Sequence, residues 1–123
     1  MINIAIIGGT GVYDPNILEN ITEQEVNTPY GSVKFKVGEY AGKIIAFIPR
    51  HGSDHSIPPH LINYRANIWA IKKIGVKNII ATTAVGSLHL AMKPGDFVLV
   101  DQFLDFTKNR ISTIYDGNGR EVV

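Results

Sequence analysis

An unbroken apolar run that ends in four small residues is the feature that most constrains the fold of this chain. Residues 2–7 are apolar except for Asn3, and the sequence Gly-Gly-Thr-Gly follows directly at 8–11. A short apolar run bounded by glycine is typical of a strand that is buried on both faces, as in a sheet covered by helices. The pattern therefore predicts a buried first strand that ends in a glycine loop.

Later segments carry further strand signals. Apolar and lysine side chains alternate over 33–37, and an Ala-Gly turn at 41–42 leads into the apolar run 43–48. This arrangement predicts a hairpin. A run rich in β-branched residues at 76–83 predicts another strand, because such side chains suit the pleated surface of a sheet. The apolar run 97–100, which continues through Asp101 and Gln102 to Phe103, predicts a last strand.

A helix is predicted between these strands. Pro58 and Pro59 are well placed to begin it, and Gly75 is well placed to end it after Ile74. Its apolar positions, with Trp69 as a core residue, form a stripe too wide for a simple surface helix. The helix is therefore either buried on most sides or part of a subunit interface. Strands that alternate with a helix predict an α/β fold, with a mixed central sheet and flanking helices.

Composition narrows the classes of function. The chain has 123 residues, a hydrophobic content of 45% and a formal net charge of +1, so it can form one compact core and has no basic patch that would favour nucleic acid or a membrane surface. It has no cysteine, which excludes disulfides and thiolate metal sites. No apolar stretch approaches the ~20 residues of a membrane span. We therefore expect a soluble, cytoplasmic protein that either handles a small molecule or makes protein contacts.

Three loops that each follow a predicted strand carry groups suited to an anion. Thr10 lies in the glycine loop, Arg50 and His51 follow the hairpin, and Thr83 and Ala84 follow the strand after the helix. An arginine fork suits a doubly charged oxyanion, and loops at the carboxyl ends of neighbouring strands meet in one crevice. If these strands are neighbours, the loops converge on a single anion, where each charge-assisted hydrogen bond contributes ~1.5–3 kcal/mol.

Other interpretations of the same residues compete. The glycine loop alone is equally consistent with a plain tight turn, and Arg50 with a surface salt bridge. His51 and His55 have the spacing of metal ligands only on a helix, and the glycine and prolines near them favour a loop. A dinucleotide-binding glycine pattern is disfavoured, because Asp14 stands where its last glycine would be.

Five motifs, taken in order, resemble those of one family. They occupy residues 6–11, 50–52, 63–70, 82–87 and 94–96. In this order the chain resembles the 5′-methylthioadenosine phosphorylase branch of the trimeric purine nucleoside phosphorylases. The glycine loop alone would not carry the resemblance, whereas the set is highly specific.

The resemblance implies a pentosyltransferase, in which inorganic phosphate attacks C1′ of a purine nucleoside and releases the purine with a ribose 1-phosphate. It implies no metal, no organic cofactor and a homotrimer or hexamer. It also implies that residues 1–123 are the N-terminal half of a phosphorylase domain, if they are not a single domain, and that the contacts to ribose and purine N7 come from elsewhere. The residues that it assigns are, for phosphate, Thr10, Arg50, His51, Thr83 and the backbone N–H of Ala84, and, for the purine pocket, Val85 and Gly86.

Two alternatives to a methylthioadenosine phosphorylase stay open. Val85 stands where several relatives carry a small or thiol side chain, which leaves a 6-oxopurine or methylthioinosine phosphorylase as one alternative. Residues 110–123 carry turn signals and no closing element, which leaves a catalytically incomplete phosphate-binding fragment as the other.

Overall fold

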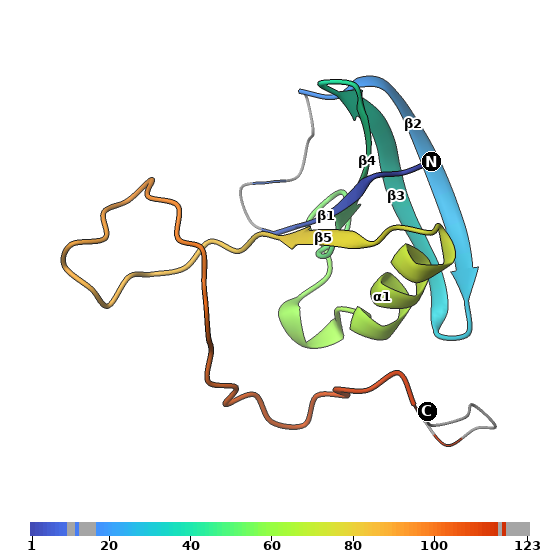
Figure 1. Cartoon of the computed structure of the whole chain (residues 1–123). Helices are drawn as coiled ribbons and strands as arrows, with labels where there is room; N and C mark the ends of the chain where they lie inside the picture. Colours follow the sequence, from blue (N-terminus) through green and yellow to red (C-terminus); the bar gives the residue numbers. More distant parts are fainter. Residues whose placement is uncertain (10–11, 13–16, 116, 118–123) are drawn as a thin grey trace.

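The computed structural model of this chain contains a five-stranded mixed sheet with a helix packed against it (Figure 1). It describes residues 1–9, 12, 17–115 and 117. The order across the sheet is β2-β3-β4-β1-β5, and the predicted α/β class with a mixed sheet is confirmed. The strands are β1 (Ile4–Gly8), β2 (Glu19–Thr28), β3 (Gly31–Tyr40), β4 (Lys43–Pro49) and β5 (Asn78–Ala81), and a 3₁₀ turn, η1 (Pro59–Leu61), precedes helix α1 (Tyr64–Lys73).

The sheet combines two kinds of pairing. Strands β2, β3 and β4 pair antiparallel, whereas β1 lies between β4 and β5 and is parallel to both. The predicted hairpin of β3 and β4 is confirmed. Its turn residues Ala41 and Gly42 have φ values of 48° and 72°, as a two-residue turn of type I′ requires.

The edge strand β2 was not predicted from the sequence. Most of its side chains are exposed, and only Val26 and Thr28 are half-buried. A strand without a buried face lacks the alternation of apolar and polar residues that marks a strand in sequence. Its pairing with β3, which includes an irregularity between Glu19 and Thr22, defines it instead.

The prediction of one continuous helix from residue 58 was wrong in its first part. The chain forms η1, then Ile62 adopts an extended conformation with ψ 126°, and α1 begins only after Asn63. The side chain of Asn63 accepts a hydrogen bond from Ala66 N at 3.1 Å, which is the N-cap interaction that starts a helix. At the other end Gly75, with φ 80°, follows the helix as predicted.

Helix α1 covers the sheet with one face only. Ala66, Asn67, Ala70 and Ile71 are buried, whereas Ile68 is 41% exposed, so the helix is not buried on most sides in this chain. The subunit-interface alternative stays a prediction. Trp69 is half-buried and its ring lies edge-on to Tyr30. The buried core cluster joins α1 to the strands and consists of Ala5, Val33, Phe35, Val37, Ala46, Ile48, Ala66, Ala70, Ile71 and Val76.

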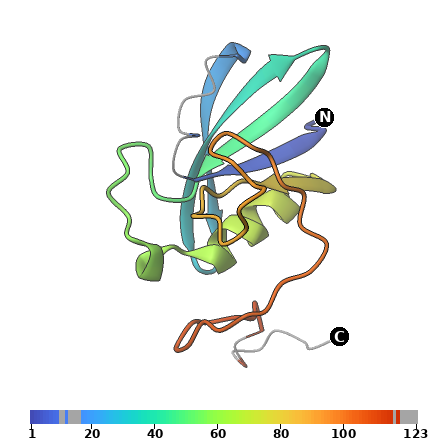
Figure 2. The ribbon, with the colours of Figure 1, turned by 90° about the vertical axis from the view of Figure 1, so that its left-hand side faces the viewer.

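The predicted strand at 97–103 was wrong. Residues 82–115 contain no helix or strand, and Phe97 and Leu99 are 102% and 98% exposed. The segment leaves β5, loops outward and returns past α1, where the hydroxyl of Tyr30 donates to Ile114 O (Figures 1 and 2). Strand propensity alone does not form a strand, because the backbone also needs a hydrogen-bonding neighbour. Over the described ranges, β5 pairs with β1 alone.

Asn63 couples the helix to the hairpin of β2 and β3, and this coupling is testable. Besides capping α1, its Nδ2 donates to Tyr30 O at 2.7 Å, in the turn between the two strands. We predict that Asn63→Ala lowers the free energy of unfolding by about 1–3 kcal/mol, because both hydrogen bonds are lost. Asn63→Asp keeps the capping acceptor and loses only the donor, so it should cost less. Urea unfolding of both variants measures the difference, and equal losses would contradict this account.

Candidate functional site

The carboxyl ends of three neighbouring strands meet at one edge of the sheet. Gly8 at the end of β1 pairs with Pro49 at the end of β4, and Ile7 pairs with Ala81 at the end of β5. Two backbone hydrogen bonds continue beyond these pairs, from Arg50 N to Gly8 O at 3.1 Å and from Thr82 N to Ile7 O at 3.0 Å. The sequence-based condition for convergence, that these strands be neighbours, is therefore met.

Arg50 spans this edge from one outer loop to the other. Its Nη1 donates to Thr82 O, and its Nη2 donates to Thr83 Oγ1 at 3.3 Å. Because β1 lies between β4 and β5, the side chain crosses the end of β1 to make these bonds. Both acceptors are neutral oxygens, so these contacts orient the guanidinium without neutralising its charge.

His51 is the buried member of the loop after β4. It is only 7% exposed, and its Nδ1 lies 2.9 Å from Ile57 O. Since a carbonyl oxygen only accepts, Nδ1 carries the proton, and the neutral ring keeps Nε2 as its acceptor nitrogen. The ring of His55 lies against it, with 5.0 Å between centroids. His51 is thus held in one tautomer by the loop itself.

A tight turn around Asp54 shapes the outer part of this loop. Gly52 has φ 80°, and its N–H donates to Pro49 O at 3.0 Å. The Asp54 carboxylate accepts from the hydroxyl of Ser56 at 2.7 Å and from its backbone N–H at 3.3 Å. These hydrogen bonds hold the pKa of Asp54 below its ordinary value, and the bond from the Ser56 hydroxyl has the largest effect. The turn is therefore best formed with the carboxylate ionised, above that lowered pKa, and weakens as falling pH protonates it.

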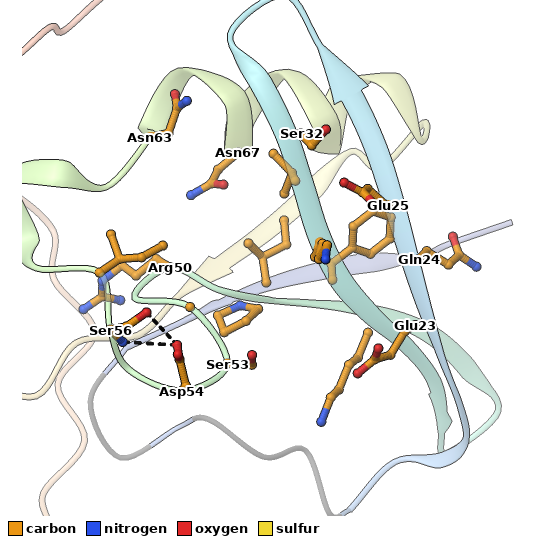
Figure 3. A pocket seen from close by; sticks show the side chains of 18 residues that line it. Glu23, Gln24, Glu25, Ser32, Arg50, Ser53, Asp54, Ser56, Asn63 and Asn67 are labelled. Carbon is orange, nitrogen blue, oxygen red and sulfur yellow. Dashed lines mark hydrogen bonds between the residues drawn. The ribbon is translucent and has the colours of Figure 1, made fainter.

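A large open groove lies beside Arg50 (Figure 3). Its volume is about 760 Å³. Arg50, Asp54 and Ser56 lie toward one end and the residues of β2 toward the other, with Asn63 and Asn67 contributed by the start of α1 (Figure 3). The groove extends from the predicted anion site along the hairpin of β2 and β3, but residues 83–86 do not line it.

The other residues predicted for the phosphate and purine sites do not all lie at this edge of the sheet. Thr10 lies outside the described residues, as does Asp14 of the rejected dinucleotide pattern. Thr83 contacts Arg50, and Ala84, Val85 and Gly86 follow it in an exposed segment, with Val85 at 79% exposure. The structure thus brings Arg50, His51 and Thr83 to one edge of the sheet and leaves the two predicted purine-pocket residues beyond that edge.

Metal ligands and membrane-spanning helices were sought in the described part of the chain. No three His, Cys, Asp or Glu side chains gather there in a way that could hold a metal ion, although the rings of His51 and His55 touch. No helix among the described residues is long and apolar enough to cross a bilayer.

Two features of this edge were not predicted from the sequence. The turn of Asp54 and Ser56 had a usable signal, because aspartate followed two residues later by serine is typical of a side-chain-capped turn. The acceptor role of Thr82 O had none, because every residue has a carbonyl and only the neighbouring strands bring this one to Arg50.

Known proteins share this chain's sequence and fold. A family model for the phosphorylase superfamily matches residues 3–122. The probable 6-oxopurine nucleoside phosphorylase of Thermococcus kodakarensis is 64% identical over 117 residues, which cover 95% of this chain and 44% of that protein. The S-methyl-5′-thioadenosine phosphorylase of Hyperthermus butylicus is 60% identical over 116 residues, which cover 93% of this chain and 42% of that protein.

A solved structure shows the same fold. The methylthioadenosine phosphorylase from Schistosoma mansoni in complex with adenine superposes with a TM-score of 0.88 at 39% identity, covering 100% of this chain and 45% of that one. The chain thus spans less than half the length of the relatives that it matches. Because one family model accounts for nearly every residue, and the sheet that carries the predicted anion site is shared with a solved member, this chain belongs to the phosphorylase superfamily.

Proposed function

We propose that the protein catalyses phosphorolysis of a purine nucleoside and that the edge of the sheet around Arg50 is its phosphate site. One observation carries the proposal: the carboxyl ends of β1, β4 and β5 lie side by side, and the guanidinium of Arg50 reaches across them while bonded to neutral oxygens. A charged fork whose partners do not cancel its charge suits a dianion. Thr10 and the N–H of Ala84 belong to the proposed set as well.

The other donors complement Arg50 chemically. In its neutral form, His51 has its proton on Nδ1, so Nε2 accepts a hydrogen bond from a protonated oxygen of hydrogen phosphate. Thr83 Oγ1 accepts from Arg50 and keeps its own proton to donate. Donors and acceptors together distinguish hydrogen phosphate from an anion that only accepts, such as sulfate.

The reaction follows from the position of such an anion. A phosphate oxygen forms a bond to C1′ while the bond from C1′ to the purine nitrogen breaks, and its electron pair leaves with the purine, which takes up a proton. The sugar carries positive charge in the transition state, so a fixed anion beneath it lowers the barrier by positioning and by electrostatics. Binding phosphate rigidly is therefore a large part of the catalysis.

The substrate is proposed to be 5′-methylthioadenosine or a related purine nucleoside. Relatives named for methylthioadenosine and for 6-oxopurines are similar to this chain at 60% and 64% identity, so both classes belong in the assay. We propose Val85 and Gly86 for the purine side. We also propose that residues 1–123 form the N-terminal half of a phosphorylase domain that acts in the cytoplasm as a trimer or hexamer, with the ribose contacts supplied by the rest of the domain.

Dependence on phosphate is the first test of this function. We predict that purine release by the protein from 5′-methylthioadenosine, inosine or methylthioinosine rises with phosphate and saturates, because phosphate is the nucleophile. The product should be a sugar 1-phosphate, detectable by phosphorus NMR. Purine release at the same rate without phosphate would identify a hydrolase and contradict the proposal, and no release with any of the three would favour a phosphate-binding fragment.

Substitution of Arg50 is the second test. We predict that Arg50→Ala raises the KM for phosphate by about 10- to 100-fold, as expected for the loss of a charge-assisted hydrogen bond, while the KM for nucleoside changes little. Arg65→Ala is the matched control, since Arg65 lies over the ring of Tyr30 at 4.5 Å from its centroid and is not in the proposed site. An unchanged phosphate KM in Arg50→Ala would remove this residue from the site.

A further inference from the structure

Gly9 lies directly beside the guanidinium of Arg50. It is buried directly after β1, and a Cβ built on it would collide with Nη1, Nη2 and Cζ of the Arg50 guanidinium, all far inside van der Waals contact. The nearest atoms at the preceding glycine are different, because a Cβ on Gly8 would meet the ring of Phe47 and Val12 O. The guanidinium therefore occupies the space that a Cβ on Gly9 would fill.

The topology explains why this contact is unavoidable. Arg50 leaves the end of β4, its acceptors Thr82 O and Thr83 Oγ1 lie after β5, and β1 stands between these two strands. The side chain must cross the chain where β1 ends, and Gly9 is the residue beneath the crossing guanidinium. Any side chain at this position would fill the same volume.

We propose that Gly9 is a positioning residue for phosphate, because its missing side chain lets the Arg50 guanidinium lie where phosphate is bound. This inference rests on the proposed function for the identity of the anion. Its structural part, that the size of residue 9 sets the location of the guanidinium, stands on the contact itself.

Alanine at this position should move the arginine and not unfold the protein. The φ of Gly9 lies outside the left-handed region, so alanine does not meet the strain there that a positive φ would impose. The atoms that collide are the far end of a flexible side chain, which can swing away. Doing so breaks the bonds to Thr82 and Thr83, and the charge leaves the edge of the sheet.

A double-mutant cycle tests this coupling. Titration calorimetry with inorganic phosphate is carried out on the wild-type protein, Gly9→Ala, Arg50→Ala and the double variant. Gly9→Ala should raise the phosphate Kd by about 10- to 100-fold, up to the effect of Arg50→Ala, because it removes the same charge-assisted bond. The double variant should bind phosphate as Arg50→Ala does. A Kd for Gly9→Ala equal to the wild type, or a further loss of the same size in the double variant, would overturn the proposal.

Two further measurements separate positioning from loss of structure. Gly38→Ala is the matched control, because its Cβ would meet Leu18 Cβ at 2.8 Å and Glu19 O at 3.0 Å, on β3 and away from Arg50. It should lower the Tm and leave the phosphate Kd unchanged. If Gly9→Ala lowers the Tm, the double variant should recover the Tm of Arg50→Ala, because the collision is gone, and failure to recover it would also overturn the proposal.

The positioning claim can be separated from the proposed function. The Nε–H resonance of Arg50 in a nitrogen-15 NMR spectrum should shift in Gly9→Ala without any phosphate present, and an unshifted resonance would overturn the claim. A wild-type protein that binds no phosphate, together with a shifted resonance, would overturn the proposed function and the phosphate part of this inference while the steric coupling of residues 9 and 50 is retained.

Discussion

The parallel pairing of β1 with both β4 and β5 is the constraint on which the candidate site depends. Parallel strands present their carboxyl ends at the same edge, so the central position of β1 brings together three strand ends that are far apart in sequence. The buried cluster that includes Ala5 and Ala46 supports this pairing from below. A slip of one residue in the pairing of β1 would move its buried side chains to the opposite face of the sheet. Burial therefore fixes the register of β1, and the register fixes which backbone atoms lie at the carboxyl edge.

Arg50 converts this arrangement of strands into a polar site. Its side chain bridges the two loops on either side of β1, and its acceptors, a carbonyl and a hydroxyl, leave the positive charge available. His51 adds a buried ring whose tautomer is set by Ile57 O, and the turn of Asp54 and Ser56 shapes the loop around it. Groups that are oriented before a ligand arrives lose little entropy when it binds, which is the property that a phosphate-positioning site requires.

Sequence-based prediction was most accurate where an element depends only on residues close to it in the sequence. The apolar run before Gly8, the Ala41-Gly42 turn and the stop at Gly75 all satisfy conditions within a few neighbouring residues. It failed where structure depends on distant partners. Strand β2 has no buried face, so its sequence lacks the alternation that would have predicted it. Residues 97–103 have strand-like side chains but no neighbouring strand among the described residues. The helix began later than expected because the Asn63 cap, not the proline pair, starts it.

By itself the sequence determined the α/β class, the hairpin and the identity of the polar groups, because hydrophobic period, turn chemistry and side-chain type are local properties. Its order of motifs also carried the resemblance that the family match confirms. Only the tertiary structure decided that Arg50 reaches Thr82 and Thr83 across the end of β1, and that a Cβ on Gly9 would collide with its guanidinium. The physical reason is that such contacts depend on strand order and on steric exclusion between segments, and neither is encoded by the neighbours of a residue in the chain.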